Sequence, residues 1–312
     1  MTTALITHAD CLAHVTPAHV EEQPARLAYV LRALEGLPLE RYEAPLAEEA
    51  SITTLHDAAY VARIKASIPG DGFVLLDADT DSETALCPTS LPAILHAVGA
   101  AQMGVDLVMS GAARNAFAAI RPPGHHAERA LAMGFCFFGN VALAARHALD
   151  RHGLSRVAIV DFDVHHGNGS QALLWDEPRV LTVTSHQMPL WPDTGYPSET
   201  GGHENVLNVP LAPGTGGIEM REAYERLVFP RLNDFAPELL LISAGFDAHA
   251  ADPLADLTWH EADYTWLTQG LCDIADTHCK GRVVSTLEGG YDLDALAASV
   301  AAHVRVLTER AG

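Results

Sequence analysis

Basic residues are scarce in this sequence. Its 312 residues include 19 Lys and Arg against 40 Asp and Glu, which gives a formal net charge of -21 with histidine neutral. A protein that tracks the phosphates of nucleic acid needs the opposite balance, so we expect no nucleic-acid partner. The excess acid keeps a protein soluble and would also attract a cationic substrate or product, and the composition leaves both explanations open.

Cysteine and long apolar runs are also limited. The five cysteines stand singly, without a C-x-x-C pair, so neither a disulfide framework nor a thiolate zinc site is indicated. The first residues lack the basic flank and long apolar core of a signal peptide, and we find no run near the roughly 18 apolar residues of a membrane span. We therefore expect a cytoplasmic protein without a membrane partner.

Apolar, β-branched runs typical of buried strands alternate with segments of helical periodicity. This alternation predicts an α/β fold: a single domain over residues 1–312 with a central, mostly parallel β-sheet flanked by helices. Strands are expected at 2–7, 180–185, 239–243 and 282–287, just before Arg121 and from Val157. Helices are expected at 24–34, 54–64, 90–108, 140–152, 219–235 and 260–276.

Polar residues gather directly after several of these strands. Asp161, Asp163, His165 and His166 fall within six positions, a density that capping of the next helix does not explain. Residues two apart on a strand point the same way, so the first three could converge on one spot. Carboxylate oxygen with imidazole nitrogen suits zinc or a similar divalent metal. Open α/β sheets place their ligands at this edge, which predicts one site there.

A second cluster delivers two adjacent histidines. Consecutive prolines fix the backbone before Gly124, which permits a close approach, and His125 and His126 follow at once. A lone histidine is more often a core residue, but a rigid loop that presents two is better explained by proton transfer.

Two later strands end in the same manner. Asp247 stands just past the strand at 239–243, and Tyr291 follows two glycines that leave room for its phenol to reach a cleft. Three metal-type ligands leave a coordination position open, as in catalytic zinc sites, where bound water has a pKa of about 7. With a base beside that water and a phenol beside the oxyanion, the parts are those of metal-assisted amide hydrolysis.

Two loops complete the expected site. Residues 71–83 form a Gly- and Asp-rich loop, interpreted as a solvated segment near the mouth of the site. The long loop 187–204 contains Trp191 and is expected to grip the substrate, because long loops within compact domains are usually functional or mobile.

Five segments carry a family resemblance. RPPGHHA, GFCFF, DFDVHHGNG, SAGFDA and LEGGY occur in the order found in zinc-dependent histone deacetylases, and the match runs from about residue 3 to about residue 308. The sequence resembles that family, of the arginase/deacetylase fold, in its class II or bacterial histone deacetylase-like amidohydrolase branch. The resemblance implies a hydrolase that removes acetyl or other short acyl groups from Nε-acyl-lysine in proteins or peptides, or from similar small acylated amines.

The resemblance also implies roles for individual residues. The zinc ligands would be Asp163, His165 and Asp247. His126 would act as general base and acid with His125 as its electrostatic partner, and Tyr291 would polarise the carbonyl. Asp161 would pair with His125, and Asn168 would pair with His126.

Two further sets of residues follow from the same resemblance. A structural potassium ion would be held by the backbone or side chains of Asp161, Asp163, His165, Ser185 and His186. The acyl-lysine tunnel would be lined by Gly134, Phe135, Trp191 and Leu254.

The sequence departs from the family at three places, the first being Trp191, which stands where a phenylalanine is common. The motif H-P-E reads Val20, Glu21, Glu22 here, although Glu22 and Arg26 remain. Leu254 stands where acetylpolyamine-specific relatives carry glutamate, which favours acyl-lysine over polyamines. An acetylpolyamine amidohydrolase, favoured by the negative charge, is the alternative enzyme. A non-catalytic acyl-ligand binder is the alternative of another class, while the acyl length, the native metal and a homo-oligomeric state stay open.

Overall fold

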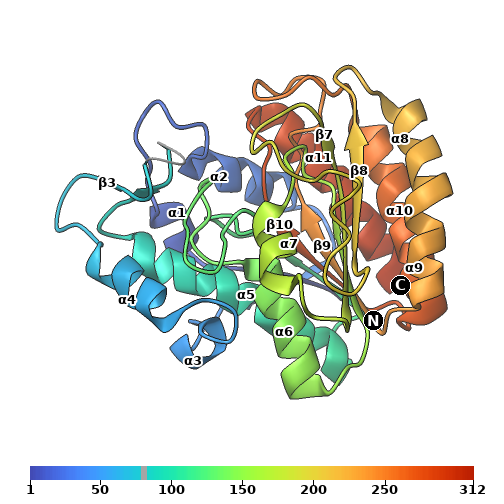
Figure 1. Cartoon of the computed structure of the whole chain (residues 1–312), viewed down its shortest axis with the longest axis horizontal. Coiled ribbons are helices and arrows are strands. Elements are labelled where there is room, and N and C mark those ends of the chain that lie inside the picture. Colours follow the sequence, from blue (N-terminus) through green and yellow to red (C-terminus); the bar gives the residue numbers. More distant parts are fainter. Residues whose placement is uncertain (79–82) are drawn as a thin grey trace.

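The central sheet has eight strands, and each neighbouring pair is parallel. The computed structural model describes residues 1–78 and 83–312, which form one α/β domain (Figure 1). From edge to edge the strands are β2 (Leu39–Glu43), β1 (Thr3–Thr7), β5 (Asn115–Ala118), β10 (Val283–Leu287), β9 (Leu239–Ala244), β6 (Val157–Asp161), β7 (Val180–Gln187) and β8 (Val206–Leu211). The predicted fold class is confirmed.

Alternate residues of each strand face two different helical layers. In β1, Ala4 and Ile6 join the core formed with α5 (Ser90–Ser110) and α6 (Asn140–His152). Leu5 joins the core formed with α2 (Pro24–Ala33), α10 (Glu261–His278) and α11 (Leu293–Ala311). In Figure 1, α5 and α6 lie on one side of the strands and α10 lies on the other. A sheet covered on both faces needs apolar residues at successive positions, which explains the continuous apolar runs in the sequence.

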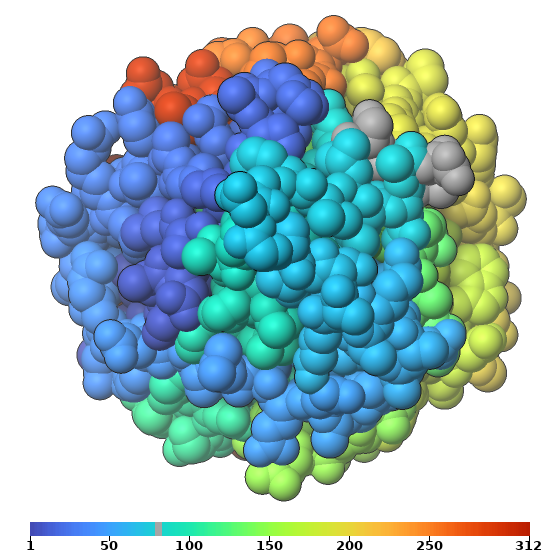
Figure 2. Space-filling model, turned by 90° about the vertical axis from the view of Figure 1, so that its left-hand side faces the viewer, coloured from blue at the N-terminus to red at the C-terminus, as the bar shows by residue number. Residues whose placement is uncertain are grey.

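Shorter elements connect the main ones. The remaining helices are α1 (Asp10–Ala13), α3 (Glu49–Ile52), α4 (Ala58–Ala66), α7 (Asn168–Leu174), α8 (Gly217–Ala223) and α9 (Phe229–Phe235). The π-helical turn η1 (Tyr224–Val228) joins α8 to α9, and β3 (Val74–Leu75) pairs with β4 (Ala85–Leu86) in a small antiparallel ribbon. From the side, the segment from α1 to α5, coloured blue to green, covers much of the surface (Figure 2).

Several predicted boundaries were wrong. The helix expected at 54–64 begins at Ala58, because the chain first turns after α3, where Thr54 Oγ1 donates to the carbonyl of Ser51. The helix expected at 219–235 is divided by η1. The edge strand β2 was missed because its sequence, LERYE, is largely charged. The strand expected at 180–185 runs on to Gln187, so that His186 and Gln187 also belong to β7.

Helix α5 is, by length and composition alone, apolar enough to cross a membrane, which the sequence analysis did not expect. Most of that apolar window, 61%, is buried inside the protein. Close packing explains the small residues of α5: a Cβ at Gly99 would lie 1.9 Å from the carbonyl oxygen of Pro45. The burial and packing are those of a core helix.

Candidate active site

Two carboxylates and an imidazole meet where β6 and β9 end. Nδ1 of His165 lies 3.3 Å from Oδ1 of Asp163 and 3.1 Å from Oδ2 of Asp247, and all three residues are buried. Asp163 and His165 follow β6, Asp247 follows β9, and these strands are neighbours in the sheet. The parallel sheet thus brings Asp247 next to His165, although the two residues are 82 positions apart in the sequence.

Backbone groups hold the two carboxylates in place. Gly289 N–H donates to Oδ2 of Asp163, and Val164 N–H donates to Oδ1 of Asp247, each at 2.8 Å. A Cβ at Gly289 would lie 2.2 Å from Oδ2 of Asp247. Position 289 therefore has no room for a side chain, which explains a glycine in the LEGGY segment.

A divalent cation fits this donor set. The ligand atoms of Asp163, His165 and Asp247 lie within 4.8 Å of one another, and two oxygens with one nitrogen suit zinc and its neighbours in the first transition row. Burial, together with the negative charge of Asp163, raises the pKa of Asp247 to about 7. Because two buried carboxylates this close resist ionising together, a cation between them would relieve their repulsion.

Two adjacent histidines lie beside these ligands. Nδ1 of His125 is 3.0 Å from Oδ2 of Asp161, and Nδ1 of His126 is 2.7 Å from Oδ1 of Asn168, so both expected pairs are present. An amide oxygen only accepts, so Nδ1 of His126 must donate, and its Nε2 is left as an acceptor. The orientation of Asn168 is fixed by its Nδ2, which donates to Oε1 of Glu128 at 2.9 Å.

The two histidines have opposite electrostatic surroundings. Burial and the neighbouring His125 lower the pKa of His126 well below its ordinary value. Burial also opposes a charge on His125, but the carboxylates of Asp163 and Asp161 raise its pKa well above the ordinary value. His126 is therefore suited to accept a proton as a neutral base, beside a partner that favours the charged form.

Tyr291 is positioned by groups from distant parts of the chain. Its backbone N–H donates to Oδ2 of Asp252 at 2.7 Å, and the guanidinium of Arg26 lies over its ring, 4.9 Å from the centroid. Arg26 also donates to the carbonyls of Glu288 and Gly290, both at 2.6 Å. Burial raises the pKa of the Tyr291 phenol well above its usual value, which keeps it a donor.

Glu22, the residue kept from the N-terminal family motif, helps to hold the arginine that lies over Tyr291. Glu22 accepts from Nη1 of Arg26 at 2.9 Å and from Nη2 of Arg121 at 2.7 Å. Although burial opposes it, the charges of Arg121 and Arg26 hold the pKa of Glu22 at about 2. This buried cluster links the loop before α2 to the segment that carries Tyr291.

A cavity of about 230 Å³ opens onto these groups. All four residues expected in the tunnel line it, together with His126, His165 and Tyr291. The ring of Trp191 stands edge-on to His126, with the centroids 4.7 Å apart, and a Cβ at Gly134 would lie 2.2 Å from Cδ2 of His126. The wall thus packs directly against the expected base.

Sequence reasoning missed some residues of the cavity and its support. Glu83 and Leu190 also line the cavity, so the end of the acidic loop 71–83 reaches it. Asp79 and Asp81 of that loop lie outside the described residues. Asp252 was missed as the partner of Tyr291. It belongs to the ADPLAD segment, but no spacing in the sequence ties it to a residue 39 positions away.

The residues expected at a potassium site also lie together. Asp161 of β6 is the register partner of Thr184 of β7, so Ser185 and His186 follow alongside Asp161 and the turn after it. All are buried. Oγ of Ser185 is 2.7 Å from the hydroxyl of Tyr224, and Asp163 N–H donates to Oδ1 of Asp161 at 3.1 Å.

Comparison with known proteins connects this site to a family. Residues 19–307 match the sequence model of the Histone deacetylase domain. The chain is 40% identical to "Histone deacetylase 14, chloroplastic" of Arabidopsis thaliana, over 96% of this chain and 73% of that protein. It is 36% identical to human "Polyamine deacetylase HDAC10", over 98% of this chain but only 48% of that protein.

A solved structure agrees with the sequence comparisons. The crystal structure of the HDA15 HD domain superposes with a TM-score of 0.92 at 31% identity, covering 99% of this chain and 90% of that one. Agreement of sequence and fold over nearly the whole chain extends well beyond the short motifs first noticed. The chain belongs to the histone deacetylase family.

Proposed function

We propose that this protein is a zinc-dependent amide hydrolase that removes acetyl or other short acyl groups from Nε-acyl-lysine. One observation carries the proposal: His165, the neutral His126 and Tyr291 line one cavity of about 230 Å³, and the ligand atoms of Asp163 and Asp247 lie within 4.8 Å of that of His165. A non-catalytic acyl binder would have no need of a base and an oxyanion donor at the same point.

The cation would be held by Asp163, His165 and Asp247, and when bound it would polarise the acyl carbonyl and acidify a water. Nε2 of His126 is the acceptor for the proton of the attacking water, because Nδ1 already donates to Asn168. The same imidazole then delivers a proton to the leaving amine.

Tyr291 supplies the second part of the chemistry. Its hydroxyl donates to the acyl oxygen as negative charge develops there, while Arg26 and Asp252 fix the phenol and the backbone. Phe135 and Trp191 cover the acyl chain and exclude bulk water, which strengthens each of these polar contacts.

For a structural cation we propose potassium, held by the backbone or side chains of Asp161, Asp163, His165, Ser185 and His186. The proposal is supported by the family resemblance and by the register that sets the end of β6 beside β7. For location we propose the cytoplasm, supported by five cysteines that are all unpaired and buried.

The acyl-lysine substrate is favoured by the chemistry of the cavity wall. Leu254 lines the cavity and packs with Val20, Phe135 and Tyr291, so position 254, unlike a glutamate there, offers no charge to an ammonium group. The competing substrate is an acetylated polyamine. It is favoured by the resemblance to a protein named polyamine deacetylase and by the net charge of -21.

The test compares kcat/KM on an acetyl-lysine peptide and on acetylspermidine, with the zinc-loaded protein and a metal-stripped control. We expect turnover of the peptide to exceed that of the polyamine and to vanish in the stripped protein. Leu254→Glu should shift the ratio toward the polyamine. A wild-type preference for acetylspermidine would establish the polyamine alternative, and equal turnover without metal would overturn the proposed chemistry.

A further inference from the structure

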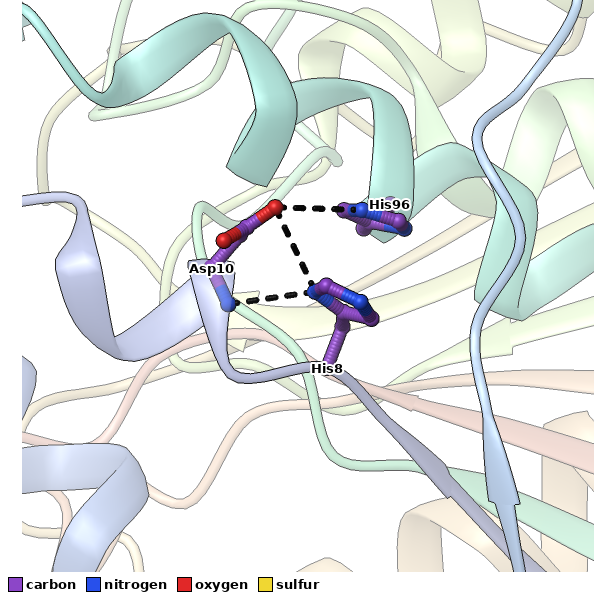
Figure 3. Close-up of side chains that lie close together, drawn as sticks. All are labelled: His8, Asp10 and His96. Carbon is purple, nitrogen blue, oxygen red and sulfur yellow. Dashed lines mark hydrogen bonds and ion pairs between the residues drawn. The ribbon is translucent and has the colours of Figure 1, made fainter.

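Beyond the active site, three groups of His, Asp and Glu side chains in the described part of the chain bring ligand atoms within 4.8 Å of one another. The first is His8, Asp10 and His96: His8 follows β1, Asp10 begins α1 and His96 lies on α5 (Figure 3). The two imidazoles are stacked, with centroids 3.5 Å apart and planes inclined by only 14°. A metal ion must lie in the plane of each ring that binds it, and two nearly parallel planes share no nearby point. This group is therefore a stacked pair of imidazoles beside a carboxylate.

The second group is His249, His260 and Glu261. Nδ1 of His249 accepts from the backbone N–H of Ala251 at 3.1 Å, so in the neutral ring the proton is on Nε2. That Nε2 faces Oε1 of Glu261 at 3.7 Å. With one nitrogen occupied and the other protonated, His249 has no lone pair for an ion.

The third group has the geometry that the others lack. Nε2 of His147 and Nε2 of His152 lie 2.8 Å and 2.7 Å from the same oxygen, Oδ1 of Asp106. The two rings are inclined by 70°, with centroids 5.7 Å apart, so their planes cross. All three ligand atoms converge on one small volume, and no other hydrogen bond to either Nε2 is found among the described residues.

The position of this group also favours a cation. Asp106 lies near the end of α5, and His147 and His152 lie near the end of α6, where the last carbonyls of a helix carry partial negative charge. Both helices end at the edge of the sheet opposite to the carboxyl ends of the strands, because each leads into a parallel strand. The group is therefore remote from the candidate active site.

The same residues line a cleft of about 890 Å³ between α5, α6 and the segment around α3. Arg146, another lining residue, is paired with Asp150 at 2.7 Å and with Glu177 at 3.3 Å, so its charge is compensated. The carboxylate of Asp106 is 55% exposed and can move outward, which the metal–ligand distances of about 2.0–2.2 Å require. Water in the cleft can complete the coordination.

We propose that Asp106, His147 and His152 form a second metal site, which takes a late first-row divalent cation such as Zn²⁺ or Ni²⁺ and joins α5 to α6. Two imidazole nitrogens and one carboxylate oxygen are the donors such ions prefer. On binding, each neutral ring carries its proton on Nδ1 and turns the lone pair of Nε2 to the ion. The site would stabilise the helix pair without taking part in the reaction.

The test counts bound ions on the full chain. Zinc is titrated by calorimetry into metal-stripped wild type, His152→Ala, Asp106→Asn and the control His203→Ala, whose histidine is exposed and outside the three groups. We expect the first two variants to bind about one equivalent fewer than wild type and the control to bind the same number. Since only this difference is used, the result does not depend on whether the active site takes zinc.

Thermal unfolding provides a second measurement. Zinc should raise the unfolding midpoint of wild type more than that of His152→Ala. His152→Gln retains a side chain that can hydrogen-bond to Asp106, so it serves as the test if the alanine variant folds poorly. Its zinc-induced rise in midpoint should be smaller than that of wild type by the same amount. Activity on the acyl substrate should be unchanged in every variant. Equal stoichiometry in wild type and the variants, or an equal thermal shift, would overturn the proposal.

Discussion

At the scale of single residues, Tyr291 offers the most direct test of the chemistry. Its phenol lines the cavity, and burial keeps it protonated. Tyr291→Phe removes only the hydroxyl, so the packing with Phe135 and Leu254 stays. We expect kcat/KM to fall by roughly two to three orders of magnitude, the usual effect of one oxyanion donor.

The matched control is Tyr196→Phe, which removes a hydroxyl from an exposed tyrosine of the loop 187–204. It should leave kcat/KM within about twofold of wild type, since surface changes away from such features are usually small. Full activity of Tyr291→Phe would remove this phenol from the mechanism.

Asn168 determines which nitrogen of His126 is free. Its Oδ1 accepts from Nδ1 at 2.7 Å, and Glu128 holds the amide in that orientation. Asn168→Leu should lower kcat roughly ten- to a hundredfold, the range for removing a partner that orients a ligand or base, with a smaller change in KM. Steady-state kinetics of the folded, metal-loaded variant measures both. A rise in KM with kcat intact would show that Asn168 supports binding and not the base.

The residues of the candidate site could be predicted where the signal is local. Asp163 and His165 stand in one short run after a buried strand, and the histidine pair follows two prolines. The support of Tyr291 could not be predicted from spacing, because Arg26 lies 264 positions from Gly290, whose carbonyl it binds. Such contacts depend on how the sheet edge and α2 come together, which no periodicity encodes.

At the scale of elements, His303 ties α11 to its neighbours. Nδ1 is 2.7 Å from Oγ1 of Thr268 in α10, and Nε2 is 3.0 Å from Oγ of Ser285 in β10. Burial lowers the pKa of His303 to about 3. Above pH 6.5 neither the folded nor the unfolded chain protonates this ring. Between pH 6.5 and about 3 only the unfolded chain does, so stability is lost as the pH falls through this range.

This difference predicts a pH slope of stability. Between pH 6.5 and 5, protonation of His303 in the unfolded chain should lower the free energy of unfolding by about 2 kcal/mol. His303→Gln should lose that part of the slope, whatever its stability at pH 7.5, while the exposed control His203→Gln keeps the wild-type slope. Urea unfolding at several pH values measures it. Parallel curves for wild type and His303→Gln would contradict the prediction.

Which elements could be predicted follows from burial. Strands covered on both faces, such as β6 and β9, are apolar throughout and were found. The edge strand β2 packs on one neighbour only, and its exposed charged residues resemble a loop. The division of 219–235 by a π-helical turn leaves no mark on the apolar period, so a single helix was expected.

At the scale of the whole molecule, the acidic surface should act on substrates before they reach the cavity. The net charge is -21, and Glu83 is one of the residues that line the cavity. A field of this sign raises the local concentration of cations, and salt screens it over about 10 Å at 0.1 M. Substrate charge should therefore influence kcat/KM independently of the fit of the acyl chain.

Ionic strength separates these two contributions. Between 0.01 and 0.5 M salt, kcat/KM should fall roughly tenfold for acetylspermidine and for an acetyl-lysine peptide flanked by lysines. It should rise for the peptide in which glutamates replace those flanking lysines. An acetyl-lysine peptide without net charge is the matched control and should change little. If all four substrates respond alike, salt acts on the enzyme itself and the field does not steer. If only acetylspermidine responds, the charges that matter lie near the cavity, and steering of substrates by the net charge of the whole molecule is excluded.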